Sequence, residues 1–177
     1  MKQKLLILSL LLCMLLMLFL WIASRKETFE NKNLGIKLSL KMNQSEIEKF
    51  LGEGRVVPMD GPSYIEKNED ISLFSYGEGK DIVFVTYNGN KSVCYNTWSL
   101  YEEVPIGSFN WSISGIGMQT SLEDVERKYP DGKTLTTGNI TIFQKISGRI
   151  NRTAVFNEDK MISLALGDLD YLTDYIS

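Results

Sequence analysis

The strongest feature of the hydrophobic pattern is an apolar run near the N-terminus. From Leu5 to Ala23 every residue except Ser9 is apolar, and basic residues flank the run on both sides. As a helix this run spans about 28 Å, which is close to the thickness of a hydrocarbon core. Residues 1–26 therefore predict a transmembrane signal anchor. A cleaved signal peptide is the alternative, although bulky Trp21 fits a small-residue cleavage site poorly.

Beyond a short polar stalk at 27–33, one pattern of apolar and polar positions occurs twice. When Ile47-Glu48-Lys49 is placed over Val125-Glu126-Arg127, apolar residues with helical spacing coincide in both copies. Asn43 then aligns with Ser121, and Glu46 with Asp124. Asn and Ser are favoured N-caps, and an acid three residues later completes a start of the capping-box type. We therefore expect a short helix directly after each cap residue.

Each expected helix is followed by segments with the composition of strands. These segments are rich in β-branched and aromatic residues, and turn residues such as Asn88-Gly89-Asn90 separate them. The expected strands are 71–76, 81–87 and 91–98 in the first copy, and 140–146, 152–157 and 160–166 in the second.

The two repeated segments, LSLKMNQSEIEKFLG and ISGIGMQTSLEDVERKYPDG, resemble the I-x-x-G-M-T/S-x-x-E-V-x-x-x-L/Y-G unit of the β-lactamase-inhibitor-protein-like fold. The resemblance covers roughly 34–166, and Lys41 stands where the family pattern has glycine. It implies an α+β fold, in which an N-terminal transmembrane helix precedes two tandem repeats of a short helix packed on an antiparallel sheet. The expected divisions are 34–98 for the first repeat, 99–111 for the connection and 112–177 for the second repeat.

The same resemblance implies a binding or assembly module without catalytic activity. The chain contains no histidine, which excludes His-based catalytic triads and most zinc sites, and no nucleophile motif is present. Cys94 is the only cysteine after the apolar run, so no intrachain disulfide forms there, and a packed thiol is the expected state. We expect no metal and no cofactor.

The net charge of the chain argues against one class of partner. The formal net charge is −3, and every acidic residue follows position 26, so the chain beyond the apolar run is more negative than the whole. That sign opposes nucleic-acid binding. Together with the apolar run at 5–23, it predicts a single-pass membrane protein with its soluble part outside the cytoplasm, or a secreted protein if the leader is cleaved.

Aromatic residues gather around the expected join between the repeats, and they are the candidate binding residues: Trp98, Tyr101, Phe109 and Trp111. Trp and Tyr are enriched in interfaces. The same residues could instead pack the two repeats together, and the sequence leaves both interpretations open.

The resulting functional hypothesis is a membrane-anchored module that holds a protein or cell-envelope partner on its sheet face or in a groove between the repeats. Two alternatives remain. One is a cell-envelope hydrolase that uses carboxylates such as Glu102 and Glu103, and the other is an accessory subunit that acts through its transmembrane helix.

Overall fold

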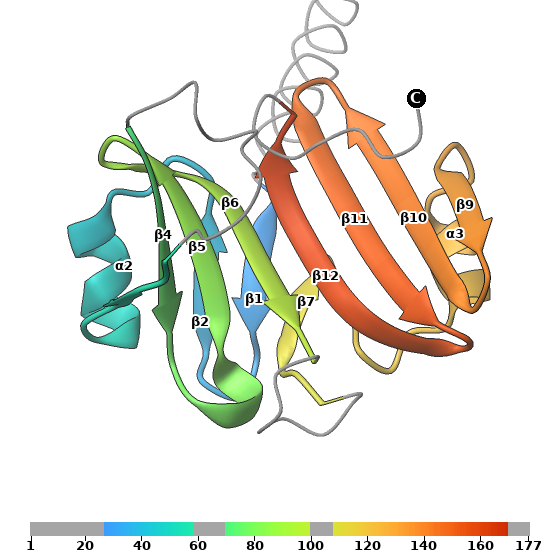
Figure 1. Ribbon diagram of the computed structural model, residues 1–177, viewed down its shortest axis with the longest axis horizontal. Coiled ribbons are helices and arrows are strands. Elements are labelled where there is room, and N and C mark those ends of the chain that lie inside the picture. The colour runs from blue at the N-terminus through green and yellow to red at the C-terminus, as the bar shows by residue number, and fades with distance from the viewer. Residues whose placement is uncertain (1–26, 59–69, 100–107, 170–177) are drawn as a thin grey trace, which may run out of the picture.

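The computed structural model describes residues 27–58, 70–99 and 108–169, and these residues form two antiparallel sheets. The larger sheet has eight strands in the order β3-β4-β5-β6-β12-β11-β10-β9, and the smaller has four in the order β2-β1-β7-β8. Figure 1 shows the smaller sheet behind the larger one. In chain order the elements are β1 (Thr28–Asn31), β2 (Ile36–Ser39), α2 (Gln44–Leu51), β3 (Arg55–Val56), β4 (Ile71–Tyr76), a 3₁₀ turn (Gly79–Asp81), β5 (Val83–Asn88), β6 (Lys91–Trp98), β7 (Trp111–Ile113), β8 (Ile116–Gly117), α3 (Leu122–Lys128), β9 (Lys133–Thr137), β10 (Ile140–Ser147), β11 (Ile150–Asn157) and β12 (Lys160–Asp168).

The order of two strands, one helix and four strands occurs twice along the described chain. The two halves share both sheets, because β1 pairs with β7 and β6 pairs with β12, each time antiparallel. In these pairs Glu30 lies opposite Ser112, and Asn96 lies opposite Ala165. Neither half therefore has a sheet of its own, and the contact between the halves is continuous backbone pairing.

The predicted helix caps are confirmed. The Asn43 side chain accepts a hydrogen bond from the Glu46 backbone N–H, and the Glu46 carboxylate accepts one from the Asn43 backbone N–H at 2.8 Å. In the second half, the Ser121 hydroxyl accepts a hydrogen bond from the Asp124 backbone N–H at 3.1 Å. These contacts satisfy N–H groups that the first turn of a helix leaves unpaired.

The predicted fold class is wrong, because the described residues are mainly β. The helices are only eight and seven residues long, and each buries one side chain, Ile47 in α2 and Val125 in α3. Figure 1 places them at opposite ends of the large sheet. Helices this short cannot cover a sheet of eight strands by themselves, and residues of the small sheet pack in the same core.

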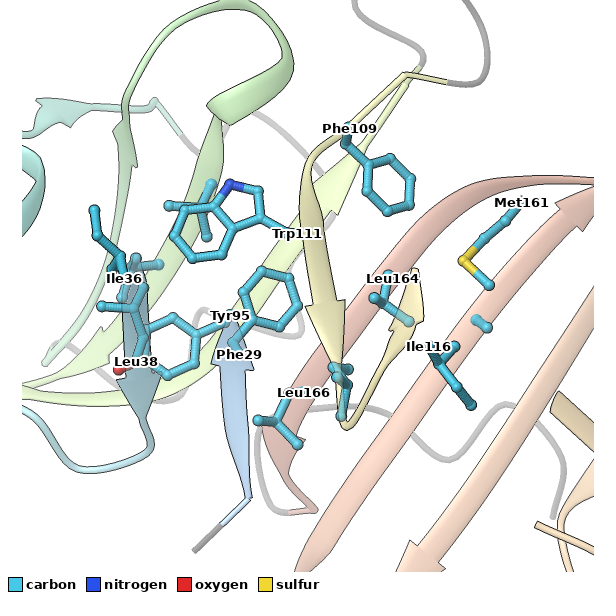
Figure 2. Packing of buried hydrophobic residues seen from close by; sticks show 14 of the residues in the cluster. Phe29, Ile36, Leu38, Tyr95, Phe109, Trp111, Ile116, Met161, Leu164 and Leu166 are labelled. Carbon is cyan, nitrogen blue, oxygen red and sulfur yellow. The ribbon is translucent and has the colours of Figure 1, made fainter. Parts of the chain in front are cut away.

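The core that joins the two sheets is aromatic at its centre. Phe29 of β1 stacks on Trp111 of β7 with ring centroids 5.2 Å apart, and on Tyr95 of β6 at 6.0 Å. Figure 2 shows these rings together between the sheets. Asp81 ties the small sheet to the turn before β5, since its backbone carbonyl accepts the Trp111 indole N–H at 2.8 Å and its carboxylate accepts the Asn31 amide at 2.6 Å. Residues 27–33, expected as a stalk, thus contain the central strand β1.

In the part of the chain that the structure describes, no helix is long and apolar enough to cross a membrane. The prediction of a single-pass membrane protein with a signal anchor and a transmembrane helix is contradicted by this finding and is not retained. The apolar run at 5–23 that suggested it lies outside the described residues.

Candidate functional site

A groove of about 790 Å³ lies between the two halves, at the edge of the molecule where β6 and β11 begin and β10 and β12 end (Figure 1). The first half contributes the end of β2, the loop that follows it and the start of β6. The second half contributes the β10–β11 turn, the start of β11 and the end of β12. Neither half forms the groove alone.

Apolar side chains from both halves line the groove: Leu40, Met42, Val93 and Ile150. Leu40, Met42 and Ile150 are partly exposed. The loop that carries Leu40 and Met42 is held against β6, because the Lys41 N–H donates to the Ser92 carbonyl and the Ser92 N–H donates to the Met42 carbonyl, both at 2.8 Å. This apolar surface is therefore preformed and does not need a bound partner to order it.

The buried side chain of Tyr95 also holds this loop in place. The Tyr95 hydroxyl donates to the Ser39 carbonyl at 2.8 Å and also contacts the Ser92 hydroxyl at 2.8 Å. Burial raises the pKa of Tyr95 far above its ordinary value, so the phenol keeps its proton and remains a donor. The end of β2 is thus fixed to β6 through one side chain as well as through backbone bonds.

Lys41 has an unusual backbone conformation in this loop. Its φ is 72°, in the left-handed region that glycine adopts freely and that costs other residues about 1–2 kcal/mol. The conformation explains why a related motif would carry glycine at this position. Lys41 is exposed and lines the groove.

Two ion pairs border the groove. Arg152 of β11 pairs with Glu27, which directly precedes β1, and their side chains are only 13% and 14% exposed. Glu27 also accepts a hydrogen bond from the Ser114 hydroxyl at 3.0 Å. Burial lowers the pKa of Arg152, but an arginine stays charged even so. The second pair joins Arg149 to Asp168 at 3.1 Å and is more exposed.

The described residues among those predicted to bind a partner do not form one exposed surface. Trp111 and Phe109 are buried in the core, with 1% and 6% of their surfaces exposed. Trp98 is partly buried and packs on Phe84 at a centroid distance of 4.7 Å, on the face of β6 opposite Tyr95. Tyr101 lies outside the described residues, as do the carboxylates of Glu102 and Glu103. Burial of Trp111 and Phe109 agrees with the interpretation that they pack the halves together.

An inter-repeat groove was one expected location for a partner, but the residues that line this groove were not among the predicted binding residues. The one signal in the sequence was Lys41, the residue that replaces glycine in the repeated motif.

The buried Cys94 thiol shows no sign of reactivity, because burial raises its pKa to about 12 and keeps it protonated.

Comparison with known proteins adds no relationship: no family model, no curated protein and no solved structure matches this chain. The resemblance to the β-lactamase-inhibitor-protein-like unit therefore stays a prediction.

Proposed function

We propose that this protein is a non-catalytic binding module that holds a segment of a protein partner in the groove between its two halves. The observation that carries the proposal is the groove itself, a preformed hollow with an apolar surface and a charged rim built jointly by the two halves. Its volume of about 790 Å³ falls within the range of about 300–1,000 Å³ that is typical of ligand sites.

The chemistry of the surface favours a peptide segment over a polyanion. Leu40, Met42 and Ile150 offer apolar contacts, and methionine adapts its shape to different partners. The rim carries charges of both signs, and the whole chain is negative, which disfavours nucleic acid and other polyanions.

Site-directed photo-crosslinking on the full chain tests the proposal. A photo-crosslinking residue at Ser147, on the groove, should capture a protein partner from an extract of the source cells. The same residue at Glu158, at the opposite end of β11, should not. Leu40→Asp should abolish capture from position 147, because a carboxylate would be buried against the partner.

The matched control is Leu34→Asp, the same chemical change at a residue that is 50% exposed and outside the groove. It should leave capture unchanged. Circular dichroism would check that both variants are folded. If no protein is captured from position 147, the proposal is contradicted. Capture that survives Leu40→Asp but is lost in Trp98→Ala would also contradict it, and would assign binding to the sheet face.

A further inference from the structure

The charged residues of the groove differ in how they are paired. The Arg152 guanidinium pairs with Glu27, and the Arg149 guanidinium pairs with Asp168. Lys41 is the exception: among the described residues, no carboxylate lies within 4.0 Å of its ammonium group. Within the part of the chain that the structure describes, the groove thus contains one cation without an ion-pair partner.

The third carboxylate of the rim does not compensate Lys41 either. Glu46 uses its carboxylate to accept the Asn43 backbone N–H at 2.8 Å, as part of the cap of α2. The carboxylates of the described rim therefore have partners within the fold, and none of them pairs with Lys41.

The backbone fixes the position from which the Lys41 side chain extends. Its φ is positive, as are those of Ser114 and Glu158 outside the groove, so this conformation alone assigns no role to the side chain. The two backbone hydrogen bonds with Ser92 hold this conformation in place. The ammonium group therefore starts from a fixed point beside the apolar surface of Leu40 and Met42.

The number of anionic groups on the partner is limited by the remaining charges. The rim residues carry three positive and three negative formal charges, and the whole chain carries −3. A strongly acidic segment would meet Glu27, Glu46 and Asp168 as well as Lys41. One carboxylate among apolar residues fits this arrangement, because it adds one ion pair with little repulsion.

We propose that the groove recognises an extended, mainly apolar peptide segment that carries one carboxylate, which pairs with the Lys41 ammonium while its apolar neighbours lie on Leu40, Met42 and Ile150. This inference rests on the proposed function and adds the chemistry of the partner to it.

The test is a selection of short random peptides, displayed on phage, against the immobilised full chain. On the wild type we expect enriched sequences with Asp or Glu at one position beside apolar residues. On Lys41→Gln, which removes the charge and keeps a side chain on the same backbone, apolar enrichment should persist and acidic enrichment should fall to the level of the unselected library. Lys32→Gln, outside the groove, is the matched control and should behave as the wild type.

A pair of synthetic peptides then measures the effect. The best selected sequence and its Glu→Gln counterpart should differ in Kd by about twofold to fivefold on the wild type, and by less than about 1.5-fold on Lys41→Gln. Acidic enrichment that survives Lys41→Gln, or apolar enrichment without acids on the wild type, would overturn the inference and leave the groove as a binding site. No enrichment on the wild type would overturn the proposed function as well.

Discussion

Removal of the Glu27 carboxylate is the perturbation whose effect the structure predicts most directly. Glu27→Ala deletes the partner of Arg152 and leaves a buried guanidinium that already has one N–H without a hydrogen-bond partner, at Nε. The guanidinium also lies over the Tyr129 ring, 5.7 Å from its centroid, so the ring covers one of its faces. The pair joins the residue before β1 to β11, and its loss weakens the contact between the halves.

The size of the effect follows from the burial of the pair. Breaking a buried ion pair by removing one partner costs about 3–5 kcal/mol. Both side chains retain 13–14% of their surface in contact with solvent, so we expect the lower end of this range, about 3 kcal/mol. The double variant Glu27→Leu/Arg152→Met removes both charges and keeps apolar volume, and it should cost less than Glu27→Ala alone.

Urea denaturation of the full chain, followed by circular dichroism, measures both free energies of unfolding. Glu27→Gln is a useful third variant, since it keeps the shape and the ability to accept a hydrogen bond while removing the charge. A loss below about 1 kcal/mol for Glu27→Ala, the value typical of an exposed pair, would refute the reasoning. A double variant less stable than Glu27→Ala would refute it too.

Four further predictions follow from burial, strain and ionisation. Trp111→Ala should lower the free energy of unfolding by about 3–5 kcal/mol, and Trp98→Ala by less, because Trp111 is 1% exposed and Trp98 is only partly buried; urea denaturation compares them. Lys41→Gly should raise the free energy of unfolding by up to about 1 kcal/mol, because relief of the positive φ outweighs the added entropy of glycine in the unfolded chain. A lower melting temperature than that of the wild type would contradict this. A hydrogen bond from a threonine hydroxyl and an ion pair with a lysine hold the pKa of the Glu30 carboxyl below its ordinary value of 4.5. Its contribution to stability is therefore present above pH 4.5 and is lost as the pH falls through the lower pKa of the folded state. Glu30→Gln should accordingly flatten the dependence of the unfolding free energy on pH in that acidic range. Cys94 should react with a thiol reagent at neutral pH only at the rate of unfolding. Rapid labelling at Cys94 itself, located by peptide mapping because the chain also contains Cys13, would contradict its burial.

The local parts of this fold were predictable because their signals lie within a few residues. Asn43 with Glu46 and Ser121 with Asp124 mark both helix starts, and the caps have the expected geometry. The alternating β-branched and aromatic residues of 71–76 and 91–98 correspond to β4 and β6 with the expected bounds. Capping and strand patterning depend on neighbouring residues alone, so the sequence carries them directly.

The fold class was not predictable by the same means. β1 and β7 have four and three residues, too few for a periodic pattern to be visible. Their pairing through Phe29 and Ile113 joins segments from the two halves, and the burial of Phe29 and Trp111 follows from that pairing. A short strand becomes central only through its partners, and the helices lie at the two ends of the large sheet.

The residues that line the candidate site were not predictable from the sequence, for a related reason. Leu40 and Ile150 lie in different halves and come to the same groove only when β6 pairs with β12. The aromatic residues at the join, including Trp111, were predicted as binding residues because interfaces and cores favour the same residue types. Lys41 alone carried a local signal, the replacement of glycine in a repeated motif.

The central claim is that a peptide segment binds in the groove between the halves. Hydrogen–deuterium exchange on the full chain, with and without the best selected peptide, tests it most directly. Binding in the groove should slow exchange in both halves at once, at 39–42 and 92–93 in the first and at 147–152 in the second. Protection confined to the part of β6 around Trp98, or no protection at these segments with the peptide bound, would contradict it.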